Sequence, residues 1–171
     1  MDLANGVIID KVTGDRCIII TKDRMSQILS RFTDIFQSSA QVLIAETSKS
    51  AGERFIAGVP EEKRADLGKF LVAGVKRFTN AGLGRVEVVK FKLEKREFKF
   101  RVRNNFFAEI RPSGESTCCY IVGAFVAGVY RGLFNDDPVV MENQCIAKGA
   151  SYCEWHVAPE SEPDKKRGNV P

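Results

Sequence analysis

Two cysteines, Cys145 and Cys153, stand eight residues apart near the end of the chain, in the segment MENQCIAKGASYCEWHV. If the chain turns at Gly149, these cysteines lie opposite each other on paired strands, with Cβ atoms about 4.5–5.5 Å apart. Thiolates that each lie about 2.3 Å from one tetrahedral zinc ion have sulfur atoms a little under about 4 Å apart, which such a pair can reach. The pair could therefore bind a metal ion or form a strained cross-strand disulfide.

The overall cysteine content and the start of the chain favour the metal. The sequence contains five cysteines, an odd number. Its first residues, MDLANGVIID, lack the basic stretch, apolar run and cleavage site of a secretory signal, so we expect a cytoplasmic protein. Structural disulfides are rare in that reducing compartment, whereas metal-binding or buried cysteines are common.

Two cysteines do not complete a structural zinc site, which normally has four protein ligands. Glu142 lies three residues before Cys145, so on a regular strand its side chain would point to the opposite face, and only a bulge or a bend would bring it to the metal. Other candidates are Cys118 and Cys119, which open an apolar segment, and His156, which follows the second cysteine. Residue spacing does not choose among them.

The first half of the chain must supply helices. Residues 6–21 predict two short strands joined by a turn at Thr13–Gly14–Asp15. After Asp23, the expected N-cap, apolar residues recur at intervals of three and four toward Gly58, which predicts one long helix or two in succession. Another helix is expected over 60–82. Its expected buried stripe consists of Leu67, Phe70, Leu71, Val75 and Phe78.

The second half supplies the strands and one buried helix. Residues 86–103 alternate between apolar and charged side chains and predict an antiparallel hairpin that turns near Lys95–Arg96. The apolar face is expected to contain Val89, Phe91, Leu93, Phe98, Phe100 and Val102. Residues 104–116 are expected to form a strand and a loop. The apolar run 118–130 is shorter than the roughly 18 residues of a membrane span, so we expect a buried helix. A last hairpin is expected over 139–157.

Length and composition agree with one α+β domain. The chain has 171 residues, of which 44% are hydrophobic and 28% charged, as in soluble globular proteins. We expect a ligand-binding-type domain over 1–158 and a polar, disordered tail over 159–171. The net charge of +4 is a small difference between 26 basic and 22 acidic residues, so it does not indicate a nucleic-acid or membrane partner.

The basic residues of the 86–103 hairpin could attract phosphates, but we expect them to form the solvated face of the sheet. Glutamates interrupt the basic run at Glu87, Glu94 and Glu97, so nucleic-acid binding is not expected. The basic residues are Lys90, Lys92, Lys99, Arg101 and Arg103.

Four segments resemble the 4-vinyl reductase domain family: LIAETSKSAGERF, GLGRVEVVKF, CYIVGAFVAGV and ENQCIAKGASYCEW. This family is a small-molecule-binding module, found alone in archaea and as the sensor domain of bacterial activators that respond to phenols. The resemblance implies a structural zinc ion held by Cys119, Glu142, Cys145 and Cys153. We expect Cys17 and Cys118 to be core residues.

The resemblance also implies the mixed α/β ligand-binding fold shared with small subunits of the TRAPP vesicle-tethering complex and with haem-based nitric-oxide sensors. It implies a homodimer formed through helices and a small apolar or aromatic ligand. Phenylalanines could line an apolar site between helices and sheet. The candidates are Phe70, Phe78, Phe91, Phe98, Phe100, Phe106 and Phe125.

No catalytic set is recognisable, because no serine, histidine and acid share an interpretable spacing and no glycine-rich phosphate loop follows a strand. The sequence therefore favours a zinc-stabilised binding or sensing domain over an enzyme. The alternatives are an enzyme or accessory protein of tetrapyrrole-type metabolism, and a protein-interaction scaffold like the tethering subunits.

Overall fold

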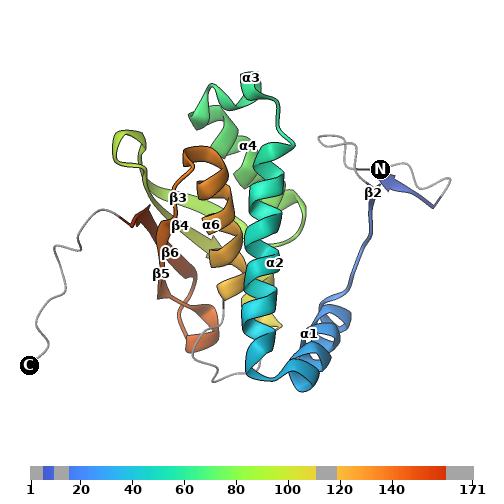
Figure 1. The fold of residues 1–171 in the computed structure, drawn as a ribbon. Helices are drawn as coiled ribbons and strands as arrows, with labels where there is room; N and C mark the ends of the chain where they lie inside the picture. Colours follow the sequence, from blue (N-terminus) through green and yellow to red (C-terminus); the bar gives the residue numbers. More distant parts are fainter. Residues whose placement is uncertain (1–5, 10–15, 111–118, 161–171) are drawn as a thin grey trace, which may run out of the picture.

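A four-stranded antiparallel sheet forms one side of the domain, and helices are stacked against one of its faces (Figure 1). The structure is a computed structural model that describes residues 6–9, 16–110 and 119–160. In spatial order the strands are β3 (Arg85–Lys92), β4 (Glu97–Arg103), β6 (Cys153–Pro159) and β5 (Pro138–Gln144). This combination of helices with antiparallel strands confirms the predicted α+β class.

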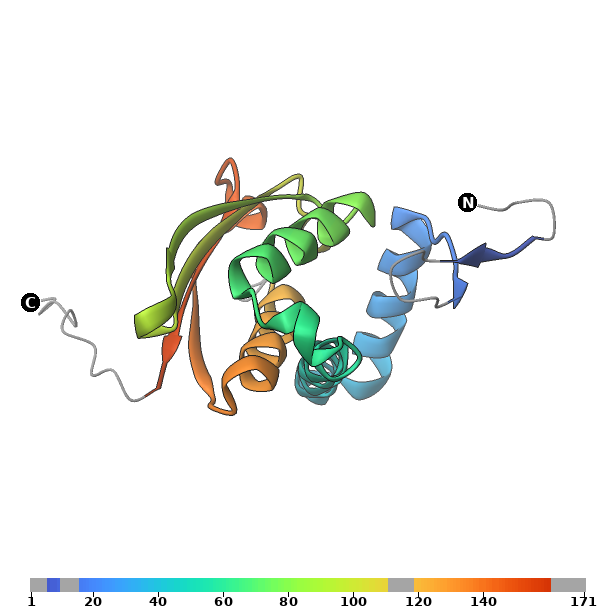
Figure 2. The ribbon, with the colours of Figure 1, turned by 90° about the horizontal axis from the view of Figure 1, so that it is seen from above.

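The helices form layers outward from the sheet. Helix α6 (Tyr120–Phe134) lies beside the sheet, and α2 (Ser38–Ala57) packs along α6 on the side away from it (Figure 2). Helix α1 (Lys22–Phe36) lies farther out, against α2, whereas α4 (Leu67–Asn80) packs near β3. Helix α6 is therefore the central element, as its apolar sequence predicts.

Glycines allow α2 and α6 to approach each other closely. A Cβ atom on Gly128 would come within 1.9 Å of the carbonyl oxygen of Lys49. A Cβ atom on Gly52 would come within 2.2 Å of the carbonyl oxygen of Phe125. Since these neighbours are backbone atoms, a larger residue at either position must push the two helices apart.

We therefore expect Gly128→Ala to lower the free energy of unfolding by about 3 kcal/mol, because overpacking against backbone outweighs the better helix propensity of alanine. Urea denaturation measures the change. Gly74→Ala is a matched control on α4, since a Cβ atom there meets nothing within 4 Å. The control should raise stability by roughly 0.5–1 kcal/mol. Equal effects of the two substitutions would contradict the close approach.

The start of α1 differs from the predicted one. Thr21, and not Asp23, is the N-cap, because the Thr21 hydroxyl oxygen accepts a hydrogen bond from the Arg24 N–H at 3.3 Å. Asp23 lies within the first turn, where a negative charge is favourable next to the helix dipole. The helical pattern then breaks at Gln37, whose φ is 49°, so α1 and α2 are two helices in succession.

The helix expected over 60–82 is also divided. A short helix, α3 (Glu61–Arg64), precedes α4, and the Asp66 carboxylate starts the second helix by accepting a hydrogen bond from the Lys69 N–H at 3.0 Å. Helix α4 ends at Asn80, as predicted. Of the expected stripe, Phe70 is buried and the other four residues are half-buried.

Strands β3 and β4 form the predicted hairpin, with a 3₁₀ turn, η1 (Leu93–Lys95), before Arg96. The alternation is interrupted in β3, where the pairing register shifts between Val88 and Lys90. Val89 at this shift and Leu93 in the 3₁₀ turn are exposed, so their predicted place on the apolar face was wrong. The prediction of a strand after the hairpin was wrong too, because residues 106–109 form the short helix α5 (Phe106–Glu109).

The outer face of the sheet carries charges that are paired with one another. Glu154 is buried between Lys99 and Arg101, each 2.7 Å away, and Arg103 contacts Glu87 at 3.1 Å. Burial opposes ionisation of Glu154, but the two cations outweigh it and lower the pKa of this carboxyl. Lys90, Lys99, Arg101 and Arg103 therefore belong to cross-strand ion pairs, as expected for a solvated face.

The ends of the chain are described in part. Strands β1 (Ile8–Ile9) and β2 (Arg16–Cys17) pair in antiparallel fashion, whereas the predicted turn at residues 13–15 lies outside the described residues. Strand β6 ends at Pro159, and residues 161–171 of the predicted tail also lie outside them. Among the described helices, none has both the length and the apolar character needed to cross a bilayer.

Candidate metal centre

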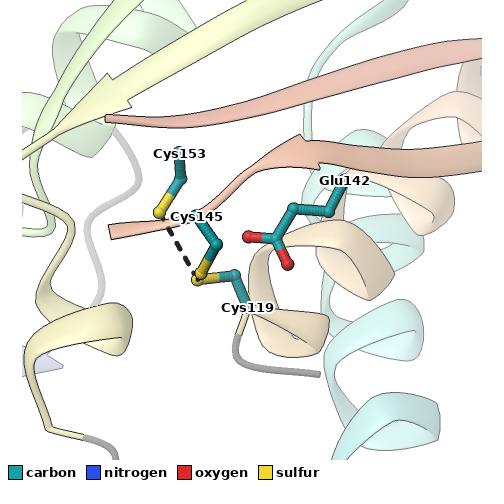
Figure 3. A group of neighbouring side chains, drawn as sticks. All are labelled: Cys119, Glu142, Cys145 and Cys153. Carbon is teal, nitrogen blue, oxygen red and sulfur yellow. Dashed lines mark hydrogen bonds between the residues drawn. The ribbon is translucent and has the colours of Figure 1, made fainter. Parts of the chain in front are cut away.

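Four side chains from three parts of the chain converge at one end of the sheet (Figure 3). Cys119 immediately precedes α6, Glu142 lies on β5, Cys145 follows the end of β5, and Cys153 begins β6. Their potential ligand atoms all lie within 4.8 Å of one another. These are the four residues that the resemblance implies, so the structure brings the whole predicted set together.

A bulge in β5 explains how Glu142 joins the cysteines. Glu142 pairs with Trp155, but Gln144 pairs with Glu154, so the register shifts between Glu142 and Gln144. The extra residue changes the alternation of side chains between the two faces, which turns the Glu142 carboxylate toward the sulfur atoms (Figure 3). The sequence spacing predicted that Glu142 could reach the cysteines only through such a bulge or a bend.

The sulfur atoms have the separation that one metal ion needs. The Cys119 sulfur lies 3.8 Å from that of Cys145 and 3.6 Å from that of Cys153. Two thiolates bound to one tetrahedral zinc ion have almost this spacing, whereas a disulfide would need about 2.05 Å. All three cysteines are free thiols, so the alternative of a cross-strand disulfide is not formed.

The cluster is largely buried and contains an oxygen atom without a hydrogen-bond partner in the described part of the chain. The three cysteines are buried in a core cluster with Trp155, whose ring stacks on Phe100. The Glu142 Oε1 atom is buried and has no hydrogen-bond partner among the described residues. A buried carboxylate oxygen without a donor is unfavourable unless a cation neutralises it. Soft thiolates together with one carboxylate are a donor set that zinc accepts, so these residues fit a zinc ion.

The three thiols of the metal-free site differ in pKa. A hydrogen bond from Cys119 lowers the pKa of Cys153 to about 6, with help from the Ile146 N–H, although burial opposes this. Burial and the Glu142 carboxylate raise the pKa of Cys145 to about 12. The hydrogen bond to Cys153, together with burial, raises the pKa of Cys119. One thiolate therefore exists near neutral pH, and the other two thiols must lose protons when a metal ion binds.

Of the other candidate ligands, His156 lies away from the cluster. The Nε2 atom of His156 is 2.8 Å from the Glu97 carboxylate, with which it forms a hydrogen bond on the outer face of the sheet. Cys118 lies outside the described residues. Sequence reasoning missed Asn105, whose side-chain amide contacts the Cys119 sulfur at 3.3 Å. The only sequence signal was an asparagine before a short apolar segment, which is typical of an N-cap.

The candidate phenylalanines fall into separate groups. Phe70 of α4 and Phe125 of α6 both contact Phe55 of α2, a residue that the sequence did not single out, with ring centroids 6.0 and 6.2 Å away. Phe91 stacks on Phe98 against the sheet. Phe78 and Phe100 pack on the core cluster around the cysteines, and Phe106 contacts Phe107. Two shallow hollows on α2 and α4 include none of these rings.

The fold of the domain is like that of a vinyl-4-reductase family protein. The chain superposes in fold on small-molecule-sensing and related domains, and the predicted fold relationship is thereby confirmed. No family model matches the sequence, and no curated protein matches it. The relationship therefore rests on structure.

Three solved structures show the likeness. The phenol-responsive sensory domain of the transcription activator PoxR, solved with phenol, has a TM-score of 0.74 and 15% identity, covering 95% of this chain and 89% of that one. A vinyl-4-reductase family protein from Methanocaldococcus jannaschii has a TM-score of 0.57 and 17% identity, covering 84% and 83%. A trafficking protein particle complex subunit 3 from Naegleria fowleri, covalently bound to palmitic acid, has a TM-score of 0.53 and 11% identity, covering 82% and 97%.

Proposed function

We propose that this protein is a zinc-stabilised domain that binds or senses a small apolar or aromatic molecule. The convergence of Cys119, Glu142, Cys145 and Cys153, in a fold like that of the vinyl-4-reductase family protein, is the observation that carries the proposal. In this proposal zinc is structural, since four protein ligands in a buried site leave no open position for a substrate. The ion fixes the start of α6 to the last hairpin and so holds the sheet against the central helix.

The ligand site is proposed at the contact of Phe55, Phe70 and Phe125. These rings come from α2, α4 and α6, and small apolar ligands commonly bind where several elements meet around aromatic side chains. The guanidinium group of Arg77 lies over the Phe55 ring, 5.4 Å from its centroid, and adds a polar group at the edge of this aromatic cluster. The phenol of the PoxR sensory domain and the palmitic acid of the trafficking subunit support an apolar ligand.

Thermal denaturation with phenol, alkylphenols and palmitate tests this function, together with native mass spectrometry of the purified protein. A compound at 100 times its Kd should stabilise the protein by about 2.7 kcal/mol. Phe125→Trp should abolish the shift by filling the site. Phe134→Trp is the matched control, because Phe134 lies on the same helix but contacts Phe98 and Tyr130. A protein with no retained compound and no thermal shift would contradict ligand binding.

A homodimer is proposed through α1 and the start of α2. Large apolar side chains on these helices are exposed, including Ile35 at 72% and Val42 at 63%. Helix α1 has no buried residue, although its apolar residues follow a regular helical stripe. A second copy of the chain presents the same apolar surface, so the two surfaces can cover each other about a twofold axis. The same exposed surface also favours the second candidate function, a protein-interaction scaffold.

We expect Ile35→Glu to convert the dimer to a monomer, because a charge would be buried at the centre of the apolar surface. Light scattering coupled to size-exclusion chromatography measures the mass. Val72→Glu is the control, since Val72 is exposed at 55% on α4, apart from this surface. A monomeric wild-type protein would reject the homodimer and favour a different protein partner.

A further inference from the structure

Asn105 joins the candidate metal centre to helix α5. The residue is fully buried and directly precedes α5. Its Oδ1 atom accepts a hydrogen bond from the Phe107 N–H at 3.2 Å, which caps the helix. Its Nδ2 atom donates to the Cys119 sulfur at 3.3 Å. One buried amide therefore satisfies a helix terminus and a potential metal ligand at the same time.

The charge of a loaded site explains why a donor is needed there. Three thiolates and one carboxylate carry four negative charges, of which a zinc ion neutralises two. The remaining negative charge lies in a buried environment and must be stabilised by hydrogen bonds to the sulfur atoms. Within the described residues, two such donors are the Asn105 amide and the Ile146 N–H, which lies 3.4 Å from the Cys153 sulfur.

We propose that Asn105 is a positioning residue of the metal centre: its amide orients Cys119 and stabilises the thiolate form, and so sets how tightly the ion is held. The inference rests on the proposed zinc site. It goes beyond that site because it assigns metal retention to a residue that is not a ligand.

Helix α5 is placed so that it can respond to the metal. It contacts the turn between the two hairpin cysteines, η2 (Ile146–Lys148). At its other end, the carbonyl oxygen of Ile110 accepts a hydrogen bond from the Ser26 hydroxyl of α1 at 3.1 Å. A shift of the Cys119 sulfur would therefore reach α5 through Asn105, and α5 in turn contacts α1.

Asn105→Asp separates the two roles of the side chain. Aspartate has the same shape and can still accept the hydrogen bond that caps α5, but it replaces the donor by a carboxylate next to the Cys119 thiolate. We expect zinc affinity to fall about 10–100-fold and zinc transfer to a chelator to accelerate. The cobalt-substituted protein should also show shifted thiolate-to-metal charge-transfer bands, which a purely structural role would leave unchanged.

Asp66→Asn is the matched control, because Asp66 caps α4 through its carboxylate and lies outside the metal centre. It should leave zinc affinity and the cobalt spectrum unchanged. If Asn105→Asp does not fold, Asn105→Ser makes the same test, since its hydroxyl can cap α5 but is too short to reach the sulfur. Wild-type zinc affinity and cobalt spectrum in the Asn105 variant would overturn the role of Asn105 and leave the zinc site standing. A wild-type protein that binds no zinc would overturn both proposals.

Discussion

Removal of zinc is expected to destabilise this protein by about 4 kcal/mol when the free ion is held a thousandfold above its Kd. The reason is the composition of the buried cluster, in which Cys119, Cys145 and Cys153 surround a carboxylate whose Oε1 has no donor among the described residues. Without the ion, the start of α6 and the last hairpin lose their common attachment. Chemical denaturation before and after treatment with a chelator, under reducing conditions, measures the difference. Metal analysis should find one zinc ion per chain.

Cys153→Ser should lose the ion and reproduce the stability of the chelated wild-type protein, because a serine hydroxyl is a poor zinc ligand at neutral pH. Cys17→Ser is the control, since Cys17 lies on β2 and is not part of the cluster. It should keep the full zinc content. A reduced wild-type protein that is fully stable and contains no metal would disprove the metal centre.

Zinc affinity should also fall as the pH is lowered, because the thiols must lose protons to bind the ion. The pKa of Cys153 is lowered to about 6, whereas the pKa values of Cys145 and Cys119 are raised. Near neutrality the metal-free site thus carries one thiolate, and binding must release about two protons. Because protons are released, acid opposes binding, and affinity should fall about 100-fold for each unit by which the pH is lowered. Chelator competition at two values of pH around neutrality determines this slope.

The pair of Cys145 and Cys153 could be predicted from residue types and from the symmetry of one hairpin, whereas Cys119 and Glu142 were chosen through the family resemblance. Cys145 and Cys153 are equidistant in sequence from Gly149. The observed pairing next to them has the same centre, because Gln144 pairs with Glu154. For Glu142, the sequence predicted only that a bulge or a bend in the strand would be needed to bring its carboxylate to the metal. A bulge depends on how two strands pair and not on the periodicity of either one.

The helix breaks and the role of Asn105 could not be predicted for a related reason. Gln37 and Asp66 interrupt segments whose apolar spacing is continuous, because local side-chain capping and backbone conformation decide where a helix ends. Asn105 stands before two phenylalanines, a composition that a strand shares with a short capped helix. Its hydrogen bond to Cys119 joins positions 14 residues apart, and only the folded chain brings them together.

Replacing Glu142 by glutamine should change stability in opposite directions with and without zinc. In the metal-free protein, the substitution removes a half-buried negative charge that lies beside three cysteines and has a buried oxygen atom without a donor among the described residues. The neutral amide has nearly the same shape and can donate to sulfur, so the chelated variant should gain about 1–2 kcal/mol over the chelated wild-type protein.

With zinc present, the same substitution removes an anionic ligand and should weaken binding about 100-fold, which corresponds to about 2.7 kcal/mol of binding free energy. After the gain in the metal-free form is included, the loaded variant should be less stable than the loaded wild-type protein by about 0.7–1.7 kcal/mol. Denaturation of the loaded and chelated forms of both proteins gives the four free energies required. Glu94→Gln, at an exposed position in the turn of the other hairpin, should leave all of them nearly unchanged. The reversal of sign is specific to a metal ligand. If the carboxylate only stabilised the fold, its removal would lower the free energy of unfolding equally in the loaded and the chelated form.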